Sequence, residues 1–259
     1  MAIYYYCSRI MPNTKCWDGL KKLLNNDLEG KRRKITFISG SIGDKSKSKS
    51  YRNGASKNLA ELGIDIKDFT LLYKNYKEVN QKGEVNYSSD DMAEQIYESD
   101  IVYLLGGDPH DQTSYLKDNN LDIVLSSFKG IIIGASSGSM TMSKNVIVPP
   151  CGDKYPTQDI RDGIGLTELS IFPHLDYHLN QESITTKDGL ITLSDLLKIS
   201  KQIDILGLTN ESIIRYSNNE IYLMGETPFL LSNGEINETN LVKEKIDNTN
   251  VKKLVLAKK

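Results

Sequence analysis

The sequence predicts an α/β protein with a mostly parallel β-sheet, helices on both faces and a small C-terminal β-hairpin region. Up to about residue 145, short apolar runs alternate with amphipathic stretches, which is typical of parallel strands joined by helical crossovers. Later strand-like runs are separated by tight turns such as Asn233 and Gly234, which favour hairpins. The 259 residues suit one large domain, predicted to span 1–259.

The individual elements follow from the spacing of apolar residues and from the residues that begin and end helices. Strands are expected at 2–6, 35–38, 64–72, 100–105, 131–133, 169–172, 203–208, 212–217, 220–224 and 254–256. Helices are expected at 18–28, 52–62, 88–98, 111–117, 121–128, 139–143 and 187–200, with Ser88 or Ser89 capping the third. Loops are expected at 44–50, 73–87 and 146–165, and the length of the last one indicates a functional role.

Composition and charge exclude several classes of protein. A formal net charge of -2 argues against a dedicated nucleic-acid binder, and no apolar run approaches the roughly 20 residues that span a bilayer. The N-terminal residues lack the basic region and cleavage site of a signal peptide, so we expect a cytoplasmic protein with no membrane partner. The cysteines, Cys7, Cys16 and Cys151, form no C-x-x-C pair, which suits a reducing compartment.

No cofactor and no metal site are expected. The glycine-rich turn at 39–43 follows a strand, but it lacks G-x-G-x-x-G and a G-K-[ST] ending, so it does not indicate a nucleotide. His174 and His178 have the i, i+4 spacing of two metal ligands on a helix, but neither H-E-x-x-H nor a third ligand accompanies them.

The clearest chemical motif is the stretch 134–138, Gly-Ala-Ser-Ser-Gly, which fits G-x-S-x-G directly after the strand at 131–133. In this nucleophile elbow, a sharp strand-to-helix turn exposes the hydroxyl of its central residue, here Ser136. The free N–H groups of the helix that follows can stabilise an oxyanion. An ordinary Gly/Ser turn is the alternative, and the preceding strand favours the elbow.

A serine nucleophile requires a base, and the chain offers His110, His174 and His178. We expect His174 to act, because it follows a proline at the end of a strand, where the backbone direction is fixed. His110 lies too close to the glycine turn at 106–107, and His178 is interpreted as a polar surface residue. Right-handed crossovers place that glycine turn and Ser136 on one edge of the sheet, at the carboxyl ends of strands.

Four segments together resemble the peptidase E (aspartyl dipeptidase) and cyanophycinase group of serine peptidases, family S51. They are Gly106-Gly107-Asp108, residues 134–139, Gly163-Ile164-Gly165-Leu166 and Phe172-Pro173-His174, within a matching core at about 100–225. The resemblance implies a glutamine-amidotransferase-like α/β fold. It also implies a serine-type peptidase that hydrolyses small peptides, in the manner of a dipeptidase, through an acyl-enzyme. Independently of the resemblance, no cofactor is expected and a homodimer is left open.

The resemblance also implies roles for individual residues. Ser136 is the expected nucleophile and His174 the expected base. Four more residues are expected around the substrate, namely Gly107 and Ser137 as oxyanion-hole N–H donors, and Gly106 and Asp108 as substrate-binding residues.

The acid that orients the histidine is left open between Asp153 and Glu211. Asp153 lies in the loop after the elbow, where peptidase E has an aspartate, and Asp159 shares that loop. Glu211 resembles an acidic position of other members. Any of these carboxylates can orient His174 and stabilise its imidazolium, and a solvated loop carboxylate is the alternative for each.

Three departures from the family pattern bear on specificity. Asp108 replaces an asparagine, Ser137 replaces an alanine, and residues 180–190 lack the arginine with which peptidase E reads an aspartyl substrate. An unscreened carboxylate beside the oxyanion and a missing arginine predict weak cleavage of peptides that begin with aspartate, unless Lys187 supplies the charge. They also motivate the alternative of a weak or inactive relative that binds a small ligand.

Two other chemistries fit less well. An ordinary α/β-hydrolase esterase has its histidine near the end of the chain, whereas no histidine follows His178. A glutaminase of the amidotransferase type requires a cysteine at the elbow, where this chain has Ser136. A serine hydrolase of small peptides is therefore the predicted function.

Overall fold

The computed structural model describes residues 2–28, 33–74, 76–80, 84–86, 88–148, 159–180, 191–238, 244–245 and 251–254. The helices are α1 (Trp17–Leu28), α2 (Lys45–Glu61), α3 (Ser89–Tyr97), α4 (Pro109–Asp118), α5 (Leu121–Ser127), α6 (Ser137–Met142), α7 (Leu175–Asn180) and α8 (Leu193–Ile199). The strands are β1 (Ile3–Cys7), β2 (Arg33–Gly40), β3 (Ile66–Tyr73), β4 (Tyr76–Val79), β5 (Glu84–Asn86), β6 (Ile101–Gly107), β7 (Ile131–Ala135), β8 (Asn145–Val148), β9 (Asp159–Asp162), β10 (Ile171–Phe172), β11 (Ile205–Gly207), β12 (Ser212–Ser217), β13 (Glu220–Gly225), β14 (Phe229–Ser232), β15 (Glu235–Glu238), β16 (Glu244–Lys245) and β17 (Val251–Leu254).

The central sheet has 11 strands within the described residues, in the order β16-β17-β13-β12-β1-β7-β6-β2-β3-β4-β5. Its five middle strands, from β1 to β3 in this order, are parallel, and helices supply the crossovers that parallel pairing requires. The strands at both edges pair antiparallel. The parallel centre predicted from the alternation of strands and helices is confirmed.

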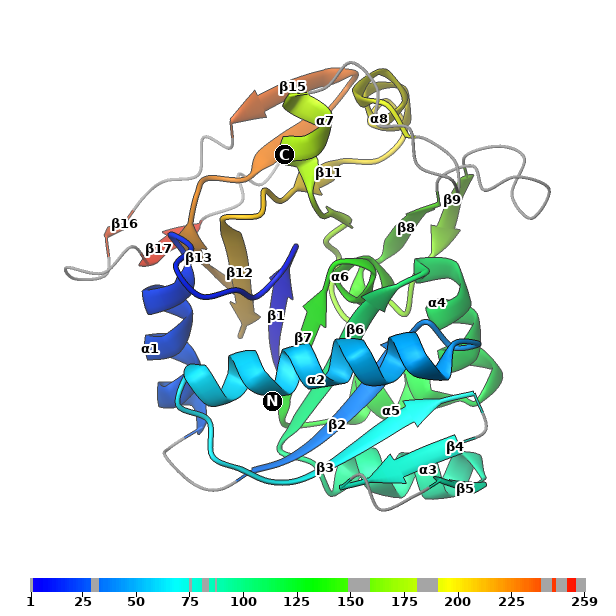
Figure 1. The fold of residues 1–259 in the computed structure, drawn as a ribbon. Coiled ribbons are helices and arrows are strands. Elements are labelled where there is room, and N and C mark those ends of the chain that lie inside the picture. The colour runs from blue at the N-terminus through cyan, green and yellow to red at the C-terminus, as the bar shows by residue number, and fades with distance from the viewer. Residues whose placement is uncertain are drawn as a thin grey trace.

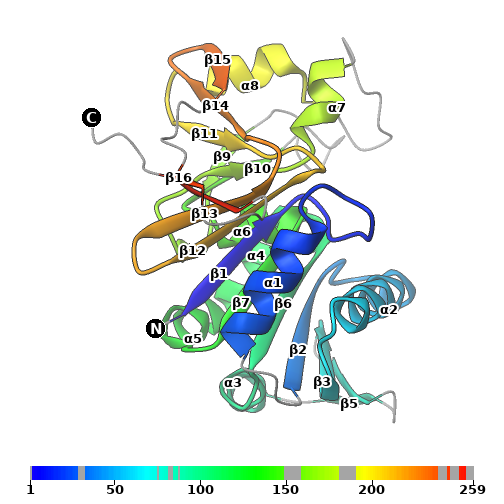
Figure 2. The ribbon, with the colours of Figure 1, turned by 90° about the vertical axis from the view of Figure 1, so that its left-hand side faces the viewer.

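Helices cover both faces of the parallel strands, as Figure 2 shows for α2 on one side and α3 and α5 on the other. Successive residues of a strand point to opposite faces. Tyr5 therefore packs in the cluster that contains α1 and α2, whereas Tyr6 packs in the cluster that contains α3, α4 and α5. Burial on both faces explains the uninterrupted apolar run at 131–133, and the predicted α/β class with helices on both faces is confirmed.

A second sheet, in the order β10-β11-β14-β15, lies with α7 and α8 above the carboxyl ends of the central strands (Figure 1). A separate apolar cluster that includes Phe172, Leu196 and Leu231 packs this layer. The predicted hairpin turn is confirmed, since β14 pairs with β15 across Asn233 and Gly234, both with positive φ. This small layer carries chain segments over the edge where the parallel strands end.

Two stretches predicted as loops form regular structure. Residues 44–50 belong mostly to α2, because Asp44 caps the helix by accepting a hydrogen bond from the Lys47 N–H and because Ser48 is buried on the sheet side. Strands β4 and β5 lie within the predicted loop 73–87 and extend the sheet by antiparallel pairing.

The region after the elbow also differs from the predicted loop at 146–165. Its two ends pair as β8 and β9, while 149–158 lie outside the described residues. The helix predicted at 187–200 is α8, which begins at Leu193 because Thr192 caps it, and 181–190 lie outside the described residues. The short helix α7 was not predicted, since its six residues are too few to show a periodic pattern. In the described part of the chain, the helices lack the combined length and hydrophobicity that crossing a bilayer requires.

Candidate active site

Ser136 occupies the sharp turn between β7 and α6 that the elbow prediction requires. Its backbone has φ 54° and ψ −120°, a strained conformation that the surrounding structure must hold in place. The Ser136 N–H donates to the Cys7 carbonyl at 2.9 Å, and Ser139 Oγ accepts from the Cys7 N–H at 2.9 Å. These two hydrogen bonds fasten the turn to the end of β1.

The glycines of the elbow are required by the close approach of backbone segments. A Cβ on Gly138 would lie 2.2 Å from the Leu104 carbonyl oxygen, and one on Gly134 would lie 2.5 Å from Met142 Sδ. The Leu104 oxygen belongs to the backbone of β6 and cannot rotate away. Helix α6 therefore packs directly on β6, and this packing sets where the turn presents Ser136.

Gly138→Ala should lower the free energy of unfolding by about 1–3 kcal/mol, the usual effect of forcing an extra carbon into a packed site. Urea denaturation followed by circular dichroism measures the change. Gly43→Ala is the matched control, because a Cβ there would have nothing within 4 Å and should change stability by less than about 0.5 kcal/mol. Equal stability of the two variants would contradict the close packing of α6 on β6.

The end of β6 lies beside the elbow. A Cβ on Gly106 would be 3.4 Å from Ser136 Cβ and 3.9 Å from Ser136 Oγ. Gly107 has φ 152°, and a Cβ there would overlap the backbone of Gly40. The structure thus brings the glycine turn and Ser136 to one edge of the sheet, as the crossovers predict. The oxyanion-hole role of the Gly107 and Ser137 N–H groups stays a prediction, with Ser137 as the first residue of α6.

Asp108 caps α4 and is not an unscreened charge beside Ser136. Its Oδ1 accepts hydrogen bonds from the N–H groups of His110 at 2.8 Å and Asp111 at 3.0 Å, and Pro109 is the first helical residue. The positive end of the helix dipole compensates a carboxylate in this position. The premise of an unscreened carboxylate is therefore wrong, although the substrate-binding role predicted for Asp108 remains a prediction.

His174 reaches the elbow from the second sheet. It follows β10 with φ 59°, and its N–H donates to Ser8 Oγ at 2.9 Å, while Ser8 Oγ donates to the Leu208 carbonyl at 3.2 Å. Held in this way, His174 Nε2 lies 2.9 Å from Ser136 Oγ. That distance is within the hydrogen-bond reach that a nucleophile and its base need.

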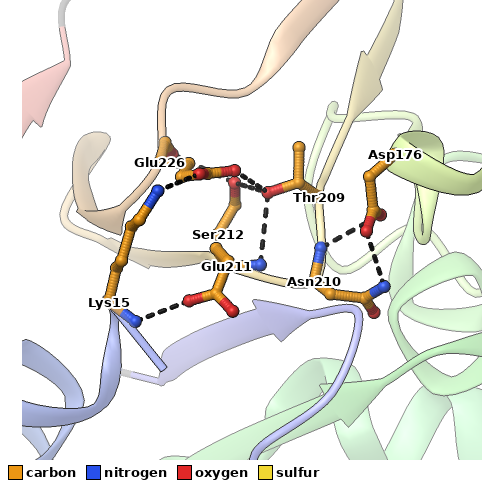
Figure 3. Close-up of polar contacts among 7 residues, drawn as sticks. All are labelled: Lys15, Asp176, Thr209, Asn210, Glu211, Ser212 and Glu226. Atoms are coloured by element: carbon orange, nitrogen blue, oxygen red, sulfur yellow. Dashed lines mark hydrogen bonds and ion pairs between the residues drawn. The ribbon is translucent and has the colours of Figure 1, made fainter. Parts of the chain in front are cut away.

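Asn210, and not Glu211, contacts the other nitrogen of the histidine ring. Asn210 Oδ1 lies 2.8 Å from His174 Nδ1, and Asn210 is only 3% exposed. Glu211 Oε2 instead accepts a hydrogen bond from the Lys15 backbone N–H at 2.5 Å, on another side of the turn (Figure 3). The prediction that Glu211 orients His174 is corrected accordingly, and Asp153 lies outside the described residues.

The other two histidines contact other partners. The His178 ring packs edge-on against Phe172, with centroids 5.2 Å apart, so it is half-buried and not the surface residue that was predicted. His110 Nδ1 lies 2.7 Å from Arg161 Nη1. Within the described residues, His174 is therefore the histidine that hydrogen-bonds to Ser136.

A pocket of about 430 Å³ opens over Ser136 and His174, and we call it the active-site pocket. The segment after β1, helix α2 and the ends of β6 and β7 line it, and they contribute two cations, Arg9 and Lys47. None of its described lining residues carries a carboxylate. Arg9 Nε is buried and makes no hydrogen bond within the described part of the chain. A buried guanidinium N–H without an acceptor is suited to bind a carboxylate of a ligand.

Other sites in the described structure are weaker candidates. A pocket of about 540 Å³, lined by residues such as Arg33, Asp100 and Gly130, lies beside the amino ends of β6 and β7, whereas parallel α/β sheets bind ligands at the carboxyl ends of their strands. No group of three His, Cys, Asp or Glu side chains among the described residues is arranged to hold a metal ion.

Comparison with known proteins identifies the family. The profile of peptidase family S51 matches residues 11–224. The chain belongs to peptidase family S51. Its membership makes the chain a serine-type peptidase, a hydrolase of peptide bonds. A search of curated proteins finds no match to the sequence.

Two solved structures share the fold of this S51 peptidase. A peptidase from an acI-B1 Actinobacterium is 14% identical with a TM-score of 0.59, and the alignment covers 92% of this chain and 97% of that one. A protein of Listeria monocytogenes EGD-e, described as a candidate peptidase E, is 17% identical with a TM-score of 0.59, and the alignment covers 88% and 100% of the two chains. Identities this low establish the fold alone.

Sequence reasoning missed three residues at the site of the S51 peptidase. Asn210 carries an amide where a catalytic histidine is expected to pair with a carboxylate, and Asp176, two residues after His174, has no motif that marks it. Of the three, only Arg9 has a position in the sequence from which its place at the site could have been predicted. It follows a central strand, and residues after the carboxyl ends of parallel strands commonly line binding sites.

The surroundings of His174 favour its neutral form. Burial lowers the pKa of His174 below its ordinary value, and the charge of Arg9 acts in the same direction. The hydrogen bond with Asn210 and the charge of Asp176 raise the pKa, but they offset burial only in part. At neutral pH the ring of His174 is therefore uncharged and able to accept a proton.

The pH dependence of the S51 peptidase should reflect this lowered pKa. His174 is the expected base, and a base is active when it is unprotonated, so kcat/KM should be level at neutral pH and fall only as the pH drops below 6.5, the ordinary histidine value. A pH–rate profile with a neutral dipeptide substrate measures the acid limb. A midpoint at or above pH 6.5 would contradict the expectation that His174, with its lowered pKa, is the base.

Proposed function

We propose that this S51 peptidase hydrolyses small peptides by acyl transfer, with Ser136 as nucleophile, His174 as general base and Asn210 as the residue that orients the base. The observation that carries the proposal is the 2.9 Å separation between Ser136 Oγ and His174 Nε2. The strained backbone of both residues supports it, because strain of this kind collects at functional sites.

The hydrogen bonds around His174 support a single tautomer. Asn210 Nδ2 donates to Asp176 Oδ2 at 2.8 Å, so the atom of Asn210 that faces His174 Nδ1 is the carbonyl oxygen. A carbonyl oxygen can only accept, and His174 Nδ1 must therefore carry the proton. His174 Nε2 is left with a free lone pair, aimed at the hydroxyl of Ser136.

The proposed reaction has two stages. Ser136 Oγ adds to the carbonyl carbon of the substrate while His174 Nε2 takes the hydroxyl proton, and the imidazolium then protonates the leaving amine. A water molecule, deprotonated by the same nitrogen, next hydrolyses the acyl-enzyme. The oxyanion of each tetrahedral intermediate is assigned to the N–H groups of Gly107 and Ser137, and losing one such donor typically lowers the rate by about 10²–10³.

The active-site pocket supports a short peptide that carries a carboxylate. Its volume of about 430 Å³ is within the range of about 300–1,000 Å³ that small-molecule sites have. Arg9 and Lys47 make the described lining cationic, which attracts a carboxylate and repels a basic side chain. We therefore propose that acidic dipeptides of the form Asp-X are preferred, which reverses the preference that the sequence predicts.

Covalent labelling combined with dipeptide hydrolysis tests the proposed function. The protein should react with a fluorophosphonate probe, peptide mapping should locate the adduct on Ser136, and Asp-Leu should yield free aspartate and leucine. A hexapeptide blocked at both ends should remain intact, because the pocket suits a short substrate. A protein that labels at Ser136 but cleaves none of a panel of dipeptides and tripeptides would contradict the assignment to small peptides.

A weak or inactive relative that binds a small ligand is the second candidate function. Asn210 favours it, because a neutral amide stabilises an imidazolium less than a carboxylate does. This alternative predicts that Asp-Leu binds in calorimetry while neither labelling nor hydrolysis occurs.

A further inference from the structure

Asn210 is held by a carboxylate on its far side. Asp176, in the first turn of α7, accepts two hydrogen bonds from this one residue. Its Oδ2 accepts from the side-chain Nδ2 of Asn210 at 2.8 Å, and its Oδ1 accepts from the Asn210 backbone N–H at 3.1 Å (Figure 3). The Asp176 carboxylate therefore accepts hydrogen bonds from both the backbone N–H and the side-chain amide of Asn210.

The hydrogen bonds with Asp176 select one of the two orientations of the Asn210 side-chain amide. In the observed orientation, Nδ2 faces the carboxylate and Oδ1 faces His174 Nδ1. In the flipped orientation, Oδ1 would face the oxygens of Asp176 and Nδ2 would face the N–H of His174, so two attractive contacts would become repulsive. A buried amide with no such partner would have no comparable preference.

We propose that Asp176 is a positioning residue of the catalytic site, the fourth member of a hydrogen-bonded chain that runs Ser136, His174, Asn210, Asp176. It acts through Asn210, whose orientation it fixes, and it supplies the negative charge that an asparagine lacks. The inference depends on the proposed function, because it assigns to Asp176 a part in the proton transfer that Ser136 and His174 carry out.

The charge of Asp176 matters when His174 becomes an imidazolium. The Asn210 amide lies between the two, and a polarised chain of hydrogen bonds in a buried site transmits stabilisation better than isolated pairs do. Other charged or titratable groups among the described residues also face His174 or line its pocket. They are Arg9 after β1, Lys47 and Tyr51 from α2, Tyr103 from β6, and Tyr177 and His178 from α7. Asp176 is the anion among these groups.

Asp176→Asn tests the role directly. One donor of Asn210 loses its acceptor, so kcat should fall by about 10–100-fold, the effect found when the hydrogen-bond partners of metal-ligating histidines are replaced. KM should change little, since Asp176 does not line the active-site pocket. The charge of Asp176 raises the pKa of His174, so its removal should move the acid limb of the pH–rate profile to lower pH. A loss of folded protein alone would leave that limb where it is.

The exchange variant, Asp176→Asn combined with Asn210→Asp, gives a second test. It places the carboxylate directly on His174 Nδ1, and the new amide at position 176 can donate to it while still accepting from the backbone N–H of position 210. The exchange variant should recover kcat to within about tenfold of the wild type, a result expected when two coupled residues act as one unit. No recovery above Asp176→Asn, with both variants folded, would overturn the proposal.

Asp195→Asn is the matched structural control. Asp195 also accepts from a backbone N–H and a side chain of one neighbouring residue, Thr192, at 3.1 and 2.7 Å, but it completes the capping box of α8 and does not line the active-site pocket. It should lower thermal stability without moving kcat or the acid limb. If Asp176→Asn behaves like this control, the positioning role is wrong. A wild type that neither labels nor hydrolyses would instead contradict the proposed function, so the two failures are distinguishable.

Discussion

Replacing Ser136 with alanine should lower kcat for dipeptide hydrolysis by at least about 10⁴-fold and should abolish fluorophosphonate labelling. The expected size follows from other serine hydrolases, where loss of the nucleophile leaves only the contribution of substrate binding and the oxyanion hole. The fold should survive, because the Ser136 side chain makes no capping hydrogen bond to α6. The free energy of unfolding should therefore stay within about 0.5 kcal/mol of the wild-type value.

Ser50→Ala is the control for this loss of activity. Ser50 lines the same active-site pocket but has no predicted part in the reaction, so this variant should label and hydrolyse at close to wild-type rates. Labelling that persists in Ser136→Ala would show that another serine is the nucleophile. Loss of labelling in both variants would mean that labelling depends on the shape of the pocket and does not identify the nucleophile.

The parallel core and the sharp turn at Ser136 could be predicted because their signals are local. Three β-branched residues at 131–133 specify a strand buried on both faces, and the glycines that follow permit the close packing of α6 on β6. The edge on which Ser136 lies follows from the handedness of the crossovers. None of these inferences requires knowledge of a contact between distant parts of the chain.

The prediction of a loop at 44–50, which was based on composition, was wrong because a tertiary contact determines the structure there. The stretch 44–50 is rich in serine and lysine, which resembles a loop, but it forms the start of α2. Ser48 is buried there and its hydroxyl lies 2.7 Å from Ser39 Oγ. The end of β2 thus supplies the partner that makes a polar residue acceptable inside the helix interface, and the sequence of 44–50 contains no sign of it.

The residue that contacts His174 Nδ1 could not be found from sequence for a related reason. Asn210 and Glu211 are neighbours in one turn, and the side chain of Glu211 is drawn toward Lys15 by a hydrogen bond from the backbone N–H of that residue. Which of two adjacent side chains faces the histidine depends on the path of a turn that distant segments fix. The amide also becomes a sensible partner for His174 only once the carboxylate of Asp176 lies behind it.

Arg9→Gln should lower kcat/KM for Asp-Leu by about 10²-fold, which corresponds to about 2.7 kcal/mol in transition-state binding. Arg9 lines the same active-site pocket as Ser136, and its buried Nε lacks a hydrogen-bond partner among the described residues. Removing one partner of a buried charge pair generally has an effect of this size. The wild type should therefore prefer Asp-Leu to Ala-Leu, and Arg-Leu should be the poorest of the three substrates.

Comparing substrates identifies the carboxylate that Arg9 binds. If Arg9 binds the aspartyl side chain, Arg9→Gln should leave kcat/KM for Ala-Leu within about threefold of the wild-type value. If it binds the terminal carboxylate that all dipeptides share, Ala-Leu should lose as much as Asp-Leu, and the C-terminal amide of Asp-Leu should be a poor substrate of the wild type. Lys57→Gln removes an equal charge from an exposed site on α2, outside the pocket, and should change neither value. Equal rates of Arg9→Gln and wild type on both dipeptides would contradict any role of Arg9 in substrate binding, and the preference for acidic peptides would then need another cation.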